Sequence, residues 1–252
     1  MILAAALMPE WVVLLTAWPA VIVGYLVFGM VGFGTTLVAI PVIAHVVPLS
    51  TAVPALAASD LLASVGNGLR LGAHVVRREV WRLMPPMLAG SAVGAWILFA
   101  VPVRTLMLIL GIFVCLYAVR GLRPQAAPEP VSPRWAMWYG FSGGVLSALF
   151  GAGGWVYSMY LVRRMDDPAQ IRATQTAVLM FSSFLRVALF AVAGRYFDLA
   201  LLLLVACLLP AMVLGLYLGH RVTLGLDRAR FMRLLYAVLL VTGASLIARA
   251  VM

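Results

Sequence analysis

Apolar runs of about twenty residues recur along the whole chain, and short polar loops separate them. A run of this length crosses the hydrocarbon core of a bilayer as a helix. We predict full spans at 11–31, 51–69, 84–101, 105–119, 135–150, 169–193, 199–219 and 231–248. Two other apolar pieces, 35–47 and 155–162, are too short to cross about 30 Å at about 1.5 Å per residue. Each is expected to be a half-helix or one arm of a re-entrant hairpin.

The composition places these runs in a membrane. Of the 252 residues, 65% are hydrophobic and 10% are charged, whereas a soluble domain carries about 25% charged residues. The formal net charge of +10 comes from arginine alone, because the chain contains no lysine. These arginines lie in short loops between spans, where membrane topology explains them better than nucleic-acid binding does. Cys115 and Cys207 fall inside spans and are expected to be inert thiols, so neither a metal site nor a cofactor is predicted.

The chain is predicted to be an all-α polytopic membrane protein built from two homologous repeats. A proline-rich linker at 120–134 follows the first repeat, 1–119, and the pattern then restarts over 135–252. A shift of 119 residues superposes the glycine cluster at 32–34 on the one at 151–153. Each repeat would hold four full spans and one short broken or re-entrant segment, which makes about eight to ten membrane segments.

The arginines also predict the orientation. Fourteen of the eighteen lie in four loops, at 70–82, 120–134, 163–172 and 221–233. Cytoplasmic loops carry the arginine excess, so all four are expected on the cytoplasmic side. This assignment needs an odd number of crossings per repeat, which inverts the second repeat and puts both termini outside. If the short pieces are re-entrant, the inversion need not fail, but the side of the termini stays open.

Glycine clusters interrupt the apolar pattern once in each repeat, at matching places. Glycine costs about 1 kcal/mol relative to alanine inside a helix, and paired breaks in two halves point to a transporter's binding site. A helix that starts there offers unpaired N–H groups to an anion. The substrate-binding residues predicted from these clusters are Gly32, Gly34, Thr35, Thr36, Gly151, Gly153 and Gly154. The alternative is that the glycines only permit tight helix crossings.

Two charged residues lie deep inside predicted spans. A charge at the depth of Arg186 costs at least about 2.5 kcal/mol, so this guanidinium is predicted to bind the substrate; snorkelling or a structural ion pair are the alternatives. Asp60 is expected to pair with Arg186 or to be the proton site that couples transport, since burial favours its neutral form. A static ion pair is the alternative. Asn67 shares the helix face of Asp60, and Gln175 completes the predicted substrate-binding set.

The stretch GFSGGVLSALFGAGG at 140–154 resembles the second glycine motif of the sulfite exporter family, TauE/SafE, also called the toluenesulfonate uptake permeases. GFGTTLVAIP at 32–41 resembles the first motif of that family. Residues 55–71, with Val80 and Trp81, resemble its third segment and the loop that follows. The resemblance implies two homologous halves and a carrier in the bacterial inner membrane for sulfite, sulfonates or related sulfur-containing organic anions.

We therefore predict a secondary transporter that moves a small sulfur-containing oxyanion across the bacterial inner membrane by alternating access, with protons as candidate coupling ions. An anion channel is the alternative, although the polar residues gather near mid-span. An intramembrane enzyme is a further alternative, but no span has paired aspartates, a His-Glu-x-x-His motif or a deep serine and histidine pair. Tryptophans such as Trp155 are expected to be interfacial anchors.

Overall fold

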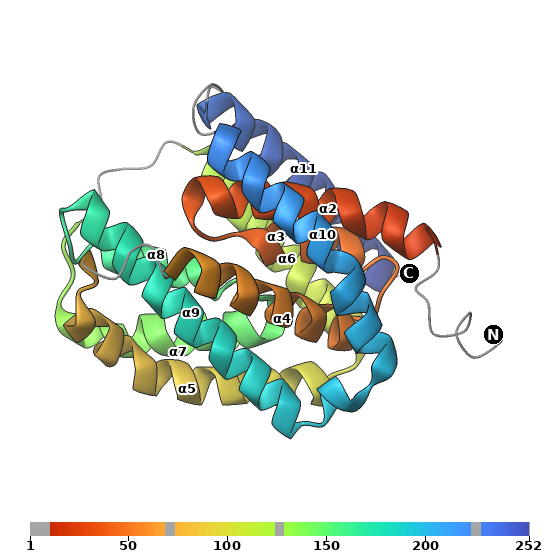
Figure 1. The fold of residues 1–252 in the computed structure, drawn as a ribbon, viewed down its shortest axis with the longest axis horizontal. Coiled ribbons are helices and arrows are strands. Elements are labelled where there is room, and N and C mark those ends of the chain that lie inside the picture. The colour runs from red at the N-terminus through yellow and green to blue at the C-terminus, as the bar shows by residue number, and fades with distance from the viewer. Residues whose placement is uncertain (1–10, 69–73, 124–128, 223–227, 252) are drawn as a thin grey trace.

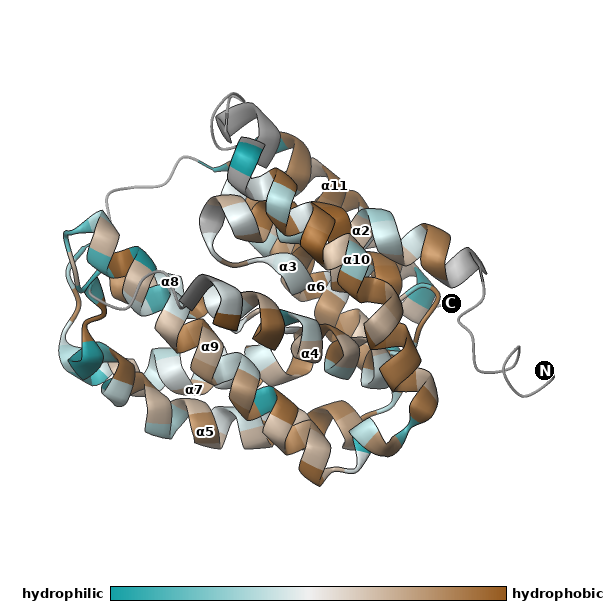
Figure 2. Ribbon diagram, in the orientation of Figure 1, coloured by the Kyte–Doolittle hydropathy of each residue, from teal (hydrophilic) through white to brown (hydrophobic). Residues whose placement is uncertain are grey.

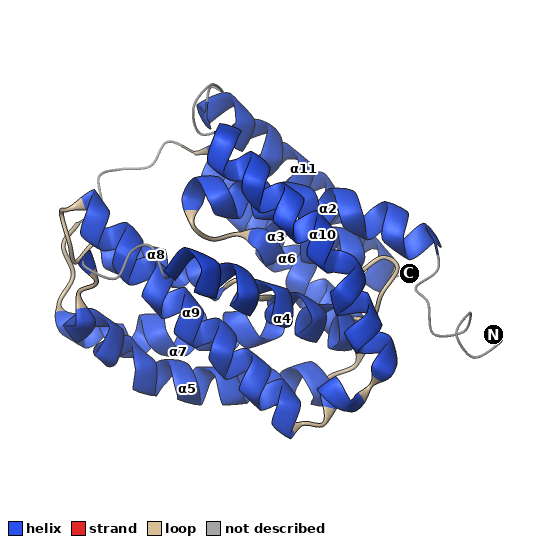
Figure 3. Ribbon diagram, in the orientation of Figure 1, coloured by secondary structure: helices blue, strands red, loops and turns tan. Residues whose placement is uncertain are grey.

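The computed structural model describes residues 11–68, 74–123, 129–222 and 228–251. Within these residues all regular secondary structure is helical (Figure 3). The first half of the chain contains α2 (Trp11–Val31), α3 (Thr35–Ile43), α4 (Leu49–Gly68), α5 (Arg77–Ala100) and α6 (Val103–Leu122). The second half contains η2 (Pro133–Trp135), α7 (Ala136–Phe150), α8 (Gly153–Val162), α9 (Pro168–Val192), η3 (Arg195–Phe197), α10 (Leu199–Val222) and α11 (Arg228–Val251).

Six helices within the described ranges are long and apolar enough to cross a membrane, namely α4, α5, α6, α9, α10 and α11. The prediction of eight full spans is therefore corrected at one of them, because α7 has only 15 residues. α2 has 21 residues and runs along α10, from Trp18 beside Cys207 to Leu26 beside Gly219. Both helices lead directly into glycine turns, where the left-handed backbone of Gly32 (φ 87°) and Gly151 (φ 65°) stops helical propagation.

α3 and α8 are the short second arms of two hairpins. The end of α8 lies beside the start of α7, because Arg163 Nη1 donates to the Tyr139 hydroxyl at 3.1 Å and the Val131 amide donates to the Arg163 carbonyl at 3.2 Å. α8 thus returns to the side from which α7 enters. α3 begins opposite the middle of α2, where a Cβ atom at Gly24 would lie 2.6 Å from the Thr35 carbonyl oxygen. The short segments therefore re-enter and do not span.

The closest helix pairs come from opposite halves of the chain. α5 packs along α7, where a Cβ atom at Gly144 would lie 2.5 Å from the Met87 carbonyl oxygen. α2 packs along α10 in the same way, with Gly219 against the Leu26 carbonyl. In Figure 1 these two pairs lie on either side of α4 and α9, which lie next to each other in the centre. Small residues let the paired backbones approach closely, as they do in many membrane helix pairs.

Two groups of helices face each other across the centre. α4 packs against α3 and α10, so α2, α3, α4 and α10 form a first group. α9 packs against α5 and α8, so α5, α7, α8 and α9 form a second group. The two groups meet mainly where α4 contacts α9. α6 and α11 pack against each other and contact α3 of the first group.

Polar contacts mark two opposite ends of the bundle. At one end the buried Glu79, at the start of α5, pairs with Arg164 at 3.2 Å, just after α8. Figure 2 shows the densest hydrophilic colouring at this end. At the opposite end the Tyr196 hydroxyl of η3 donates to the Pro54 carbonyl of α4 at 2.8 Å. Burial raises the pKa of Tyr196 to about 12, so this hydroxyl stays protonated and remains a donor at neutral pH.

Candidate functional site

The two glycine turns meet in the centre of the bundle. Gly34, with φ 107°, immediately precedes α3, and Gly151 ends α7. The Thr36 hydroxyl donates to the Gly151 carbonyl oxygen at 2.7 Å and so joins the turn of one half to the turn of the other. A side chain at Gly151 would clash with that hydroxyl, and its positive φ also favours glycine. The turn therefore needs glycine for two independent reasons.

A cavity of about 20 Å³ lies at this junction. Both glycine turns contribute to its wall, together with α4 and α9. The predicted residues in the wall are Gly34, Thr35, Thr36, Asp60, Gly151, Gly154 and Arg186. The fold thus gathers residues from both halves of the chain around one small space.

Both short helices begin at this cavity without a capping side chain. The N-cap residue is Gly34 for α3 and Ala152 for α8, and neither makes a side-chain hydrogen bond to the first turn. The first N–H groups of a helix have no acceptor within the helix, and together they carry about half a positive charge. The two helix starts therefore give the cavity a positive potential and free amide donors, which suit an anion.

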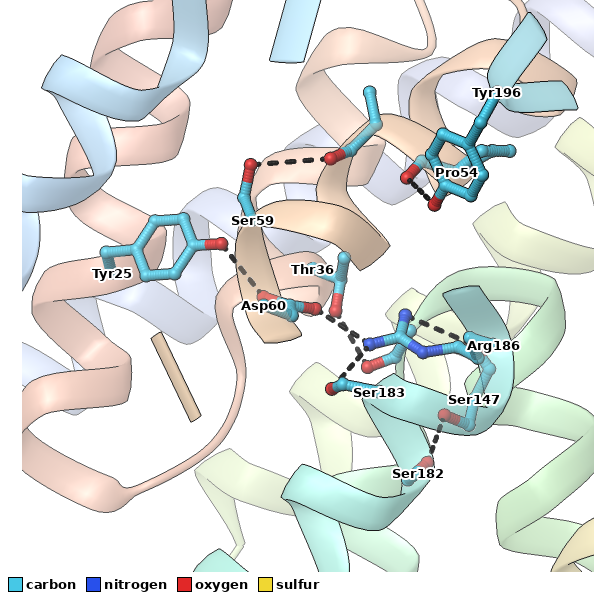
Figure 4. Close-up of polar contacts among 12 residues, drawn as sticks. Tyr25, Thr36, Pro54, Ser59, Asp60, Ser147, Ser182, Ser183, Arg186 and Tyr196 are labelled. Carbon is cyan, nitrogen blue, oxygen red and sulfur yellow. Dashed lines mark hydrogen bonds and ion pairs between the residues drawn. The ribbon is translucent and has the colours of Figure 1, made fainter. Parts of the chain in front are cut away.

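Asp60 and Arg186 form a buried ion pair in the cavity wall (Figure 4). Arg186 Nη2 lies 2.9 Å from Asp60 Oδ2, and the two side chains are 4% and 7% exposed, respectively. The Tyr25 hydroxyl donates to the other carboxylate oxygen, Oδ1, at 3.0 Å. Because Asp60 is on α4 and Arg186 on α9, the pair bridges the two helix groups. This pairing is one of the arrangements predicted for Asp60, whereas proton binding stays a prediction.

Two of the three Arg186 guanidinium nitrogens donate hydrogen bonds. Nη1 donates to the Ser147 carbonyl at 3.4 Å and Nη2 also reaches the Ser183 hydroxyl at 3.3 Å. The buried Nε–H has no hydrogen-bond partner within the described residues. An unsatisfied buried donor costs about 1–3 kcal/mol, so its retention calls for a functional explanation. In the same described residues, no group of three side chains that could hold a metal ion is found.

Three predicted residues whose side chains are described lie outside the cavity wall. Gly32 is in the turn before α3, and Gly153 packs against α7 at the start of α8. Gln175 contacts the first turn of α8, where its Nε2 donates to the Gly154 carbonyl at 2.7 Å. Its contact therefore supports the first turn of α8 and does not reach the cavity. The side chain of Asn67 lies outside the described part of the structure.

Sequence reasoning missed part of the wall. Ser147 lines the cavity and lies within the motif at 140–154, one helical turn before Gly151. Its position on the same helix face as Gly151 could have identified it. The prediction that Trp155 is an interfacial anchor was wrong. Trp155 lines the cavity and packs against the rings of Phe113 and Tyr117, with centroids 6.1 and 5.2 Å away. Tyr25 had no recognisable signal, because a tyrosine in an apolar span does not reveal its partner.

A helical bundle in which two broken helices start beside one buried arginine has the architecture of a membrane transporter. The chain belongs to the sulfite exporter TauE/SafE family, whose model matches residues 17–246. It is also similar to the probable inner membrane transporter protein TsaS of Comamonas testosteroni. The two are 26% identical over 189 residues, which cover 74% of this chain and 79% of that protein. No solved structure matches the chain.

These similarities confirm the predicted family. Both the family and the relative are transporters, so the protein is a transporter and not an enzyme. The inner membrane location of the relative agrees with the six apolar helices, and the protein is a multi-pass component of the bacterial inner membrane.

Proposed function

We propose that this transporter moves a small sulfur-containing oxyanion by alternating access and holds it between the first turns of α3 and α8 and the guanidinium of Arg186. The observation that carries the proposal is the convergence of both uncapped helix starts and Arg186 on one cavity. The two helix ends together contribute about one positive charge. Asp60 neutralises Arg186 in the present packing. While this ion pair is closed, one negative charge would balance the two helix ends.

The size of the cavity supports a carrier over an open channel. About 20 Å³ admits roughly one water molecule, so an oxyanion enters only when the walls separate. The walls belong to two different helix groups, which supports a cycle in which the groups move against each other. A channel would instead need a continuous path through the same packing.

The order of the helices supports two inverted repeats, 1–119 and 135–252, joined by the linker at 120–134. Each half has a hairpin with a short second arm, followed by three helices long enough to span. In this scheme α2 and α3 correspond to α7 and α8, and α4 to α6 correspond to α9 to α11. Three crossings per half is an odd number, which inverts the second repeat. With the arginine-rich end in the cytoplasm, both termini would lie outside.

The chemistry of the wall supports an organic sulfur anion within the predicted class of sulfite, sulfonates and related anions. Phe28, Phe33 and Trp155 line the cavity beside the polar residues, so apolar surface lies next to the anion donors. The family takes its name from sulfite export, and a sulfonate presents the same type of oxyanion on an organic group. The planar fork of Arg186 suits two oxygens of such a group.

Ligand-dependent thermal stabilisation of the purified protein tests the anion site. Sulfite, methanesulfonate, benzenesulfonate and acetate would each be added to wild type, to Asp60→Asn and to the double variant Asp60→Asn/Arg186→Gln. The single variant keeps the guanidinium and removes its competitor, so a sulfur anion should raise its Tm at least as much as that of wild type. The double variant should lose this rise, because it lacks the guanidinium but leaves no unpaired charge. An undiminished rise in the double variant would remove Arg186 from the site.

A flux measurement separates carrier from channel. In proteoliposomes a carrier exchanges labelled for unlabelled anion and so shows counterflow, whereas a channel does not. Exposed Arg104, at the start of α6 and away from the cavity, provides the matched control. Arg104→Ala should retain counterflow at the wild-type rate.

A further inference from the structure

Asp60 has a second buried partner that the proposed function leaves unused. The Tyr25 hydroxyl donates to Oδ1 at 3.0 Å, while Arg186 donates to Oδ2 at 2.9 Å. Tyr25 is fully buried, and Figure 4 shows it approaching the carboxylate from the side opposite Arg186. Each oxygen of the carboxylate therefore has its own partner, and the two partners come from different helices.

Tyr25 and Asp60 belong to the same helix group. α2, which carries Tyr25, and α4, which carries Asp60, both pack against α10. The contact with α10 is close, because a Cβ atom at Gly215 would lie 2.9 Å from Tyr25 Cβ. Arg186 belongs to the group formed by α5, α7, α8 and α9. When the groups separate, the hydrogen bond from Tyr25 stays within one group, whereas the ion pair crosses the boundary.

We propose that Tyr25 is a positioning residue that holds Asp60 in place and sets how readily it takes a proton when Arg186 turns to the substrate. This inference rests on the proposed function. Once Arg186 leaves Oδ2, that oxygen takes up a proton from a hydronium ion, which becomes water, and the neutral carboxyl no longer competes with the oxyanion for the guanidinium. The Tyr25 hydroxyl favours the ionised carboxylate by donating to it, and so it opposes protonation.

In the described part of the chain, no charged or titratable group other than Tyr25 donates to Asp60 from within the same helix group. Arg186 on α9 favours the ionised form only while the pair is closed. Tyr196 on η3 acts on Asp60 electrostatically, but its hydroxyl donates to the Pro54 carbonyl. α3 presents threonine hydroxyls, one of which is bound to Gly151, and the buried residues of α10 are apolar. Control of the proton on Asp60 therefore falls to Tyr25.

The test is the pH dependence of benzenesulfonate binding by the purified full-length protein. In wild type, binding should weaken as pH rises through the midpoint at which Asp60 loses its proton. Tyr25→Phe keeps the ring contact with Phe28 but removes the donor. A hydrogen bond to a carboxylate favours its ionised form, so loss of this donor should move the midpoint up. At a pH above both midpoints the variant should then bind about ten- to a hundredfold more tightly.

Tyr157→Phe is the matched control. Tyr157 is another fully buried tyrosine, on α8, and its hydroxyl lies near Ser147 and Ser182 rather than bonding to Asp60, so its removal should leave the midpoint unchanged. Asp60→Asn should bind benzenesulfonate equally well at pH values below and above the wild-type midpoint. A wild-type midpoint in Tyr25→Phe, or a pH dependence that persists in Asp60→Asn, would overturn the inference and leave the anion site standing. Absence of binding in every variant would overturn the proposed function itself.

A second substitution covers the case in which Tyr25→Phe does not fold. Site-specific replacement of Tyr25 by 3,5-difluorotyrosine retains the hydroxyl and nearly the same volume while making it a stronger donor. The midpoint should then move down, in the direction opposite to that of Tyr25→Phe. An upward shift or no shift would contradict a role for this hydrogen bond.

Discussion

Arg186 and Asp60 are tolerated at their depth because each neutralises the other. An isolated charge inside a membrane protein is expensive, and a buried pair offsets that cost only when its geometry is close and its remaining donors are bonded. The 2.9 Å contact and the bonds to Tyr25, Ser183 and Ser147 meet most of this requirement. The exception is Arg186 Nε, which remains available beside the cavity.

Removal of one partner should therefore destabilise the protein strongly. Arg186→Gln is expected to lower the free energy of unfolding by about 3–5 kcal/mol at neutral pH, because it leaves a buried carboxylate without a counter-charge. The loss should shrink as pH falls, since a proton neutralises the unpaired carboxylate. Asp60→Asn/Arg186→Gln should recover most of the stability. Denaturant unfolding in micelles measures all three, and a double variant as unstable as the single one would contradict this account.

At the scale of the element, glycine serves two distinct purposes. Gly151 has a positive φ and ends α7, and Gly34 has a positive φ and immediately precedes α3, which places the starts of α3 and α8 at the cavity. Gly144, in contrast, is helical and allows α7 to approach α5 closely. Gly144 thus serves close helix packing, whereas anion binding at the two glycine clusters stays a prediction.

Gly144→Ala should destabilise the helix pair formed by α5 and α7. The added Cβ would lie 2.5 Å from the Met87 carbonyl and 2.9 Å from the Ser91 amide, so the backbones must move apart. Such overpacking typically costs about 1–3 kcal/mol. The control is Gly66→Ala on α4, where a Cβ meets nothing within 4 Å and helix propensity alone should stabilise by up to about 1 kcal/mol. Melting temperatures that fall equally for the two variants would rule out close packing as the cause.

At the scale of the whole molecule, the two ends of the bundle differ in charge and in contacts. Arg82 and Arg164 surround Glu79 at one end, together with the returning arm of the second hairpin. The other end is closed by η3 and by Arg249, whose Nη1 donates to the His45 carbonyl at 2.6 Å. Arginine is enriched on the cytoplasmic side of inner membrane proteins, so the end near Glu79 should face the cytoplasm.

Labelling of intact cells tests this orientation. Exposed Ser132, before α7, and exposed Asp198, after η3, would each be replaced by cysteine in a variant with Cys115 and Cys207 changed to alanine. A membrane-impermeant maleimide should label Asp198→Cys in intact cells and Ser132→Cys only after the membrane is opened. The reverse pattern would place the arginine-rich end outside.

The membrane class, the family and the pairing of Asp60 with Arg186 could be predicted because each depends on a strong local signal. Apolar length, motif spacing and the cost of a charge at depth are readable from single segments. The number of long spans was overestimated, because hydropathy does not show that α7 stops early to form a hairpin. Trp155 was misassigned for a similar reason, since its position beside a glycine turn lies in the interior of the fold.

The sequence by itself determined that the chain lies in a membrane, where its helices break and which charges must find partners, because hydrophobicity and glycine content act within one segment. Only the tertiary structure decided that the two breaks touch through Thr36 and Gly151, that Gln175 supports the first turn of α8, and that Tyr25 bonds to Asp60. These contacts join residues far apart in the chain, and they depend on how the helix groups pack against each other.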